Sequence, residues 1–294
     1  MSLSTVIQLV IDGILTGGIY ACVAIGLSLS FGIMRIFNWA QGDTYMMAMF
    51  LLYLLIGTTS IHPYLAILIM VPVMFLFGLL LQKYVINPLV MRSKARENLD
   101  VMLTTAGISY IIYNLAVYIF TTNAKSVETP ISGKMFNFGT ISIVQGKVYA
   151  FIAIVAVTIG LELLLKKTEV GRALRATSQD KETALLMGMN NTNLYCLANA
   201  INHACIGLSA CVMIPMYTVS PASGQTFGFK SLIVVVLGGK GSVPGALLGG
   251  LIIGLVETLG AYYFNNVIAQ MIIFALFACI LFLKPNGLLS KEKT

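Results

Sequence analysis

The run VYAFIAIVAVTIGLELLL, residues 148–165, decides the class of fold, because its only charged side chain is Glu162. A bilayer core about 30 Å thick needs roughly 20 apolar residues of helix to cross it. Soon after this run, the stretch EVGRALRATSQDKETALLMGMN, residues 169–190, carries six charges. An apolar span followed by a compact, positively flanked segment is typical of a membrane helix that ends in a water-exposed loop.

The composition of the whole chain predicts the same class. The chain has 294 residues, of which 58% are hydrophobic and 10% are charged, whereas soluble domains are about a quarter charged. We therefore expect an all-α, polytopic integral membrane bundle in which residues 1–294 form a single transmembrane domain. The N-terminal segment has neither a positive n-region nor a small-residue cleavage site, so its apolar run is expected to be a retained span.

Apolar runs recur along the chain at intervals that suit a helical bundle. Besides residues 148–165, candidate spans lie at residues 6–30, 44–56, 64–81, 101–121, 194–217 and 267–283. The segment 230–259 is also apolar but is broken by GGKGSVPG, residues 238–245. We expect this broken segment to cross twice, which gives about nine crossings. A version with eight crossings fits nearly as well.

Positive charge indicates the orientation of the bundle. Lys and Arg gather in a loop near residues 83–96, in a second loop near residues 166–181, and in the C-terminal tail. We expect these three regions in the cytoplasm and the uncharged N-terminus outside. The loop at residues 123–147 would then face outward, and the alternating pattern of Thr140–Val144 favours a short strand in a small lid or docking surface there.

Several functional classes are disfavoured by composition. The net charge of +7 is not arranged as a basic patch interleaved with aromatic residues, so no nucleic-acid partner is expected. The five cysteines fall in or beside apolar runs and form no C-x-x-C pair, which predicts neither a metal site nor a disulfide framework. We expect no cofactor.

The charged stretch contains helix-boundary signals of its own. Asp180 is a good N-cap, Glu182 stands in the first turn, and Gly188 suits the residue after the helix end. Ala184, Leu185 and Met187 give this helix an apolar stripe. Arg172 and Arg175 share one face of a preceding helix. A helix this short is marginal in water unless it packs on something, so the stretch is either an anchoring loop or a docking helix for a cytoplasmic partner.

Four motifs carry a resemblance to a known family. The loop GRALRATSQDKETALLMGMN, the N-terminal stretch GIYACVAIGLSLSFGIMRIFNWAQGD (residues 18–43), the stretch VLGGKGSVPGALLGGLIIGLVE (residues 236–257) and the ending LKPNGLL (residues 283–289) stand in order across nearly the whole chain. Together they resemble the permeases of branched-chain amino acid ABC transporters.

The resemblance implies a set of partners and a cellular location. It implies a multi-pass protein of the bacterial inner membrane that works in lipid with a second permease subunit, cytoplasmic ATP-binding subunits and an external solute-binding protein. The loop at about residues 166–193 would couple the permease to the ATP-binding subunits. The residues expected to do so are Arg172, Arg175, Asp180, Glu182, Ala184, Leu185, Met187 and Gly188. The chain has no G-x-x-x-x-G-K-[ST] motif, so it is expected not to be an enzyme and ATP hydrolysis is assigned to a partner.

Two interruptions of the helical pattern indicate where a small-molecule solute could pass. Unwound backbone at membrane depth is tolerated where protein buries it or where it lines a cavity. The translocation residues expected on this ground are Asn38, Gln41, Asp43, Gly238, Gly239, Gly241 and Ser242. Glu257 is added because a carboxylate within a membrane span is costly and often functional. The alternative is that both interruptions are turns at the cytoplasmic surface. Glu257 could meet a solute ammonium or pair with another helix.

Position 41 departs from the family pattern. Members commonly show a sequence of the type Asn-Phe-Ala-His-Gly-Glu, where this chain has Gln41 and Asp43. Glutamine does not titrate near neutral pH as histidine does, so a proton-linked role is not expected at this position. Related importers carry urea, short amides and other amino acids, so the solute class stays open among them.

Two rival classes explain part of the sequence. A secondary carrier that works without ATP would account for the broken helices but not for a capped, charged docking helix. A membrane-embedded enzyme would need paired histidines or a nucleophile–base motif, which the sequence lacks.

Overall fold

The computed structural model of the chain describes residues 3–59, 61–92, 97–127, 129, 133–138, 141–284 and 287–289. Its helices in the first half are α1 (Leu3–Met34), α2 (Gln41–Thr59), α3 (Ile67–Leu81), the π-helical turn η1 (Gln82–Ile86), α4 (Asn87–Arg92) and α5 (Glu97–Phe120). Two strands follow, β1 (Met135–Phe138) and β2 (Ile141–Val144). The second half holds α6 (Gln145–Lys167), α7 (Glu169–Gln179), α8 (Lys181–Leu186), α9 (Asn191–Met213), α10 (Pro221–Gly238), α11 (Val243–Tyr263) and α12 (Asn266–Leu283).

The architecture is an all-α bundle of membrane-spanning type, as the sequence predicts. Among the described residues, seven helical stretches are long and apolar enough to cross a membrane. They are residues 4–34, 67–90, 99–120, 145–167, 191–213, 243–263 and 266–283. Helices α2 and α10, which carry Asp43 and Lys230, have 19 and 18 residues. If α2 and α10 also cross the membrane, the total is the nine crossings expected from the sequence. The number of crossings stays a prediction.

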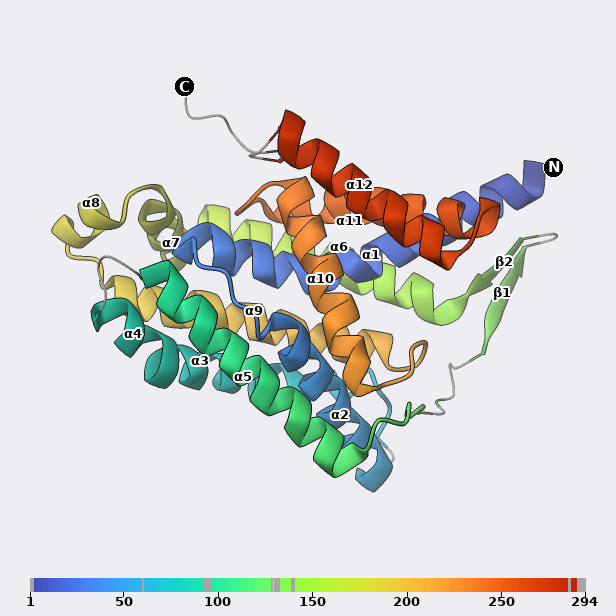
Figure 1. Cartoon of the computed structure of the whole chain (residues 1–294), viewed down its shortest axis with the longest axis horizontal. Helices are drawn as coiled ribbons and strands as arrows, with labels where there is room; N and C mark the ends of the chain where they lie inside the picture. The colour runs from blue at the N-terminus through green and yellow to red at the C-terminus, as the bar shows by residue number, and fades with distance from the viewer. Residues whose placement is uncertain are drawn as a thin grey trace.

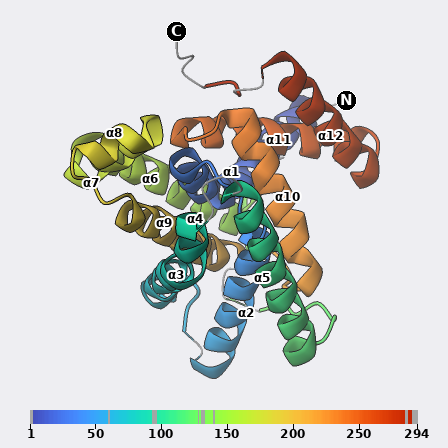
Figure 2. The same ribbon diagram turned by 60° about the vertical axis from the view of Figure 1, so that its left-hand side comes forward.

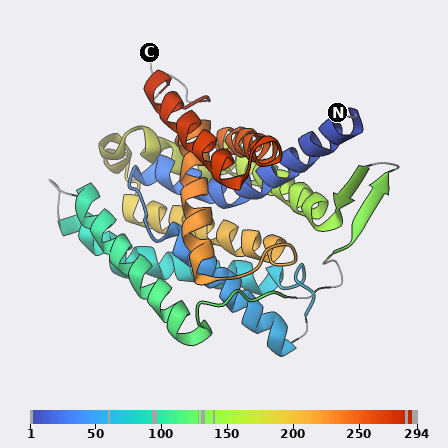
Figure 3. The same ribbon diagram turned by 45° about the vertical axis from the view of Figure 1, so that its right-hand side comes forward.

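The two ends of the long axis carry different elements. Figure 1 shows α7 and α8 at one end and the β1–β2 hairpin, with the start of α1, at the other. The hairpin is antiparallel, with Met135 opposite Val144, and β2 runs directly into α6 (Figure 3). The predicted strand at residues 140–144 is therefore confirmed from Ile141 onward, while Thr140 lies outside the described residues. Lys94 and Arg96 of the first positive loop also lie outside them.

Helices α1 and α11 approach each other unusually closely because glycines line both surfaces. Gly13 and Gly17 of α1 meet Gly250 and Gly254 of α11 in a small-x-x-x-small arrangement. A Cβ placed on Gly254 would lie 2.2 Å from the Gly17 backbone nitrogen. Only hydrogen fits in that space, so the two backbones are in direct contact.

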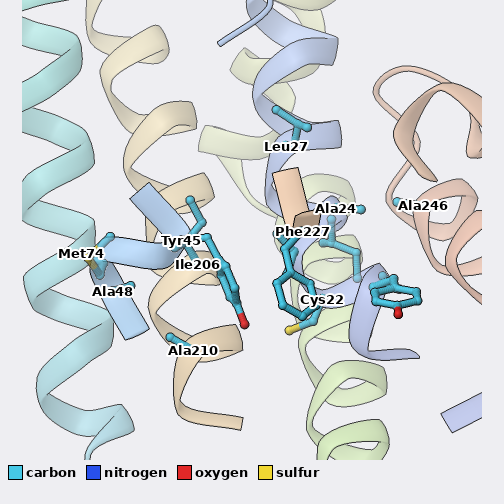
Figure 4. Close-up of a cluster of buried hydrophobic side chains, with 14 of the residues drawn as sticks. Cys22, Ala24, Leu27, Tyr45, Ala48, Met74, Ile206, Ala210, Phe227 and Ala246 are labelled. Atoms are coloured by element: carbon cyan, nitrogen blue, oxygen red, sulfur yellow. The ribbon is translucent and has the colours of Figure 1, made fainter. Parts of the chain in front are cut away.

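The buried core joins helices that are distant in the sequence. Figure 4 shows Cys22 and Leu27 of α1, Tyr45 of α2, Ile206 of α9 and Phe227 of α10 in one cluster. The Tyr45 ring is completely buried, and its hydroxyl donates to the Met213 sulfur at 2.8 Å. In contrast, α5 and α12 lie at the outside of the bundle (Figure 2), and few of their residues are buried, as expected for helices that face lipid or another subunit.

Candidate functional site

A polar cavity of about 520 Å³ lies among α1, α10 and α11. Its lining includes the first half of α1, the start of α6 just after the hairpin, and the connection from α9 to α10. It therefore belongs to the hairpin end of the bundle. Four charged side chains line it: Asp12, Lys147, Lys230 and Glu257.

The first ion pair in the cavity joins α10 to α11. The Lys230 ammonium lies 2.8 Å from Glu257 Oε1 and 2.9 Å from Oε2. Tyr20 of α1 completes the group, because its hydroxyl donates to Glu257 Oε1 at 3.0 Å and accepts from Lys230 at 2.8 Å. The side chains of Lys230 and Glu257 are 12% and 23% exposed. They are thus largely withdrawn from water while still reaching the cavity.

The second ion pair joins α6 to α1. Lys147 Nζ lies 2.6 Å from Asp12 Oδ1 and 3.1 Å from the Thr16 hydroxyl. Asp12 precedes Thr16 by four residues and Tyr20 by eight, so all three stand on one face of α1. Side chains on one face of α1 therefore contact the charged groups of both ion pairs.

Aromatic rings form the apolar part of the cavity wall. Phe227 packs against Tyr20 and Tyr217 with ring centroids 6.2 and 5.7 Å apart. Tyr217 lies in the connection between α9 and α10, outside the helical stretches that are long enough to cross a membrane. Burial raises its pKa to about 12, with smaller contributions from the negative charges of Glu257 and Asp12. Its hydroxyl therefore stays protonated at neutral pH.

Sequence reasoning found one of the four cavity charges as a site residue. The sequence predicts a solute ammonium or another helix as the partner of Glu257, and in the structure its partner is Lys230 on α10. Asp12, Lys147 and Lys230 were not predicted as site residues. Lys230 marked only the beginning of a broken apolar segment, and the partner of Lys147 is 135 positions away in the chain. An isolated lysine within an apolar run was the available signal.

The first predicted interruption, Asn38–Asp43, forms a buried polar cluster at the start of α2. The side-chain amides of Gln41 and Asn202 of α9 exchange two hydrogen bonds, at 3.1 and 2.8 Å. Asp43 accepts a hydrogen bond from Ser109 of α5. Asn38 Oδ1 accepts from the Ala40 amide at 2.9 Å. The cluster and the Lys230–Glu257 pair have no side-chain partner in common among the hydrogen bonds of the described residues.

This cluster leaves some buried polar atoms without a hydrogen-bond partner. Among the described residues, Asn38 Nδ2 and Asp43 Oδ1 are in this position. A carboxylate oxygen withdrawn from water is costly unless something binds it. The cluster therefore has polar atoms that a polar solute could bind, and the pathway role of its residues stays a prediction.

The second predicted interruption is the tight turn between α10 and α11. Gly239 and Gly241 take φ angles of 108° and 84°, which glycine adopts without strain. Ser242 caps α11 by accepting a hydrogen bond from the Gly245 amide at 3.1 Å. The predicted translocation residue Gly238 lies at the end of α10, where its carbonyl accepts from the Leu289 amide at 3.2 Å. The ending similar to the family's terminal motif thus pairs with this turn.

The turn is fixed against the end of α1. A Cβ placed on Gly32 would lie 2.3 Å from the Gly241 Cα atom, and the Ser28 hydroxyl donates to the Ser242 carbonyl at 3.2 Å. Arg35, just beyond α1, reaches the Ser178 carbonyl of α7 at 3.1 Å. These contacts place the turn at the α7–α8 end of the bundle, opposite the hairpin.

The charged loop folds into the two short helices that the sequence indicates. Helix α7 contains Arg172 and Arg175, and its N-cap Thr168 accepts from the Gly171 amide at 3.0 Å. Leu174 is completely buried, which anchors α7 to the bundle. Arg172 lies 3.6 Å from Glu169 in an exposed ion pair, of a kind that contributes little to stability.

Both ends of α8 are capped as predicted. Asp180 Oδ1 accepts from the amides of Glu182 and Thr183, at 2.9 and 3.2 Å. At the other end, Gly188 has a φ of 80° and its amide donates to the Leu185 carbonyl, while the Met189 amide donates to the Ala184 carbonyl. This pair of hydrogen bonds is a Schellman motif, which satisfies the last carbonyls of the helix.

The apolar side chains of α8 divide between two faces. Ala184 is 3% exposed and packs on the chain itself, whereas Leu185, Leu186 and Met187 are 62%, 85% and 75% exposed. Leu186 was not among the residues that the sequence indicated. Helix α8 and its C-cap residue Met187 therefore present three large apolar side chains to the outside at the end opposite the hairpin. Throughout the described residues, no group of three or more His, Cys, Asp or Glu side chains is placed to hold a metal ion.

The all-α bundle and its seven apolar helical stretches define a multi-pass membrane protein. Residues 9–281 match the family described as "Branched-chain amino acid transport system / permease component". The chain belongs to this family of permeases, and the resemblance drawn from its four motifs is confirmed.

Full-length relatives support the assignment. The chain is 28% identical to the high-affinity branched-chain amino acid transport system permease protein BraD of Pseudomonas aeruginosa, over 98% of this chain and 96% of the relative. It is 27% identical to the corresponding protein LivH of Escherichia coli K12, with the same two coverages. A shorter match, 31% identical over 36% of this chain, is to the fructose import permease protein FrcC of Rhizobium meliloti. No solved structure matches the chain.

Proposed function

We propose that the chain is the membrane-spanning permease subunit of an ATP-driven importer for branched-chain or closely related amino acids. A solute-binding protein would deliver the solute at the hairpin end, and a second permease subunit would complete the pathway. ATP-binding subunits would attach at the α7–α8 end, which would be cytoplasmic together with the C-terminus. The names of the full-length relatives support the solute class.

The observation that carries the proposal is the exposed apolar face of α8. A helix of six residues is too short to be stable on its own, yet this one is capped at both ends and anchored through Ala184. Exposing Leu185, Leu186 and Met187 to water is unfavourable, by about 25 cal/mol for each Å² of apolar surface. Contact with a groove on an ATP-binding subunit would remove that cost.

Such a contact would also explain how ATP could drive transport. ATP must favour one conformation of the assembly over another by a difference in binding free energy. Because α8 is capped at both ends, it resists unwinding when the ATP-binding subunit moves. It would therefore transmit that movement to α7 and α6. Arg172, Arg175 and Glu182 would then supply polar contacts around the apolar centre of the interface.

The first experiment is a mild-detergent purification of the chain from its native membrane, with the co-purifying subunits identified by mass spectrometry. We expect a stoichiometric ATPase that is lost in the double variant Leu185→Ser/Leu186→Ser. Both side chains are exposed, so the permease itself should still accumulate. Met135→Ser on the hairpin is the matched control, because it removes an exposed apolar side chain at the opposite end and should retain the ATPase.

The same preparation distinguishes the rival functions. Reconstituted into liposomes with its partners, the complex should take up leucine only when ATP is supplied. Uptake of urea instead of leucine would replace the solute class, and uptake without any ATPase would establish a secondary carrier.

A further inference from the structure

The cavity at the hairpin end is balanced in charge. Its four charged side chains form two ion pairs, Lys230–Glu257 and Lys147–Asp12. A cavity with equal numbers of lysines and carboxylates attracts neither net cations nor net anions, but it offers partners for both ends of a dipolar molecule. Its volume of about 520 Å³ is in the range that holds small ligands.

If Lys230 and Glu257 separate, a polar group remains beside them. Tyr20 contacts both charged groups, and its ring also lies 4.4 Å from the Lys230 ammonium. If the two charges separate, Tyr20 still donates to the carboxylate or accepts from the ammonium. A molecule carrying its own ammonium and carboxylate could then replace each charge's lost partner.

We propose that Lys230 and Glu257 form a binding site for a zwitterionic solute. Lys230 binds the carboxylate of the solute, Glu257 binds its ammonium, and the direct ion pair closes the site when it is empty. This inference rests on the proposed transport function and names the residues that recognise the solute within it.

The surroundings of the pair provide room for an aliphatic side chain. Phe227 precedes Lys230 by three residues, so both lie on one face of α10. Its ring, with those of Tyr20 and Tyr217, forms an apolar wall beside the two charges. A solute whose carboxylate is held by Lys230 can direct its side chain along Phe227. The site thus favours an apolar amino acid over urea or a sugar, which have no charge for either residue.

A purely structural role for the pair makes a different prediction. If the pair only joined α10 to α11, replacing both charged groups with uncharged ones of similar size would leave transport unchanged, because buried ion pairs are often replaceable without loss of stability. If the pair binds solute, the same replacement removes two charge-assisted hydrogen bonds to it.

The test is leucine uptake by the assembled transporter in liposomes, with binding protein and ATP. In Lys230→Met/Glu257→Gln we expect uptake to fall by at least about tenfold, with unchanged amounts of assembled complex. The control is Glu162→Gln, which neutralises a carboxylate of α6 that is paired with a lysine at 2.8 Å and lies outside the cavity lining. Uptake by the cavity variant within twofold of the control would overturn the proposal.

A second variant tests the site if the neutralised variant is unstable, through measurements of its assembly and of its uptake. If the neutralised variant does not accumulate, the exchange Lys230→Glu/Glu257→Lys should restore assembly by re-forming the pair, yet leave uptake low because the solute would face exchanged partners. Normal uptake by that variant would show a structural role.

Binding can also be tested without ATP. Saturating leucine should raise the thermal midpoint of the purified permease, whereas 4-methylpentanoate, which lacks the ammonium, and urea should not. The rise should disappear in the neutralised variant. If leucine does not raise the thermal midpoint of the wild-type chain, the proposed binding site is refuted. If leucine raises the midpoint but the wild-type complex shows no ATP-dependent uptake, only the importer function is refuted.

Discussion

The side-chain amides of Gln41 and Asn202 form a closed pair, each donating one hydrogen bond and accepting the other. Both residues are buried, with 2% and 0% of their surface exposed. The pair joins the start of α2 to the middle of α9. Because both amides are buried, neither can replace a lost partner with a hydrogen bond to water.

Replacing one member of this pair should cost more than replacing both. Gln41→Leu leaves the Asn202 amide without its partner, at a cost of about 1–3 kcal/mol in the free energy of unfolding. In Gln41→Leu/Asn202→Leu neither polar group remains, so part of that stability should return. Thermal unfolding of the purified variants in detergent measures both effects. A double variant whose loss equals the sum of the two single losses would show that the amides do not interact.

The glycine contact between α1 and α11 should not tolerate even one added methyl group. In Gly254→Ala the new Cβ would meet the Gly17 nitrogen at 2.2 Å and the Gly13 carbonyl at 2.4 Å. Forcing the two backbones apart should lower stability by about 1–3 kcal/mol. The comparison is Gly160→Ala, since nothing lies within 4 Å of a Cβ at that position in α6. That variant should be neutral or more stable by up to about 1 kcal/mol.

The caps of α8 should govern how often this helix opens. Asp180→Ala removes the acceptor for two amides and should destabilise the helix by about 1 kcal/mol. Gly188→Ala places an L-residue at a φ of 80°, which costs about 1–2 kcal/mol. Hydrogen exchange of the amides at residues 182–189 should become faster in both variants. Asp180→Asn keeps the cap and should exchange like the wild-type chain; equally slow exchange in Asp180→Ala would mean that the cap does not hold α8.

The membrane helices were predictable because the length of an apolar run is a local property. The run at residues 148–165 lies within α6, which extends it by only a few residues at each end. The caps at Asp180 and Gly188 were predictable for the same reason, since capping acts within one or two turns. The direction in which Ala184 and Leu186 point was not, because it depends on how α7 and α8 pack on the bundle.

The cavity shows why the candidate site was only partly foreseen. Glu257 attracted notice as a carboxylate in an apolar segment, but its partner Lys230 stands on another helix, and the third member, Tyr20, is 237 positions from Glu257. Contacts over such separations follow from helix packing, which a pattern along one chain does not display. The turn at Gly239–Gly241 was recognised as a break, yet its position against Gly32 likewise came only from the structure.

The tight contact of α1 with α11 has a mechanical consequence. The two helices touch near Gly13, at Gly17 and again where Gly32 meets the turn before α11, so they should move as a single stiff rod rather than slide past each other. One tip of that rod holds Arg35 against Ser178 of α7, and toward the other stand Asp12 and Glu257. A small tilt imposed at the first tip would therefore displace the walls of the cavity directly, as a lever does, with no relay of intervening side chains.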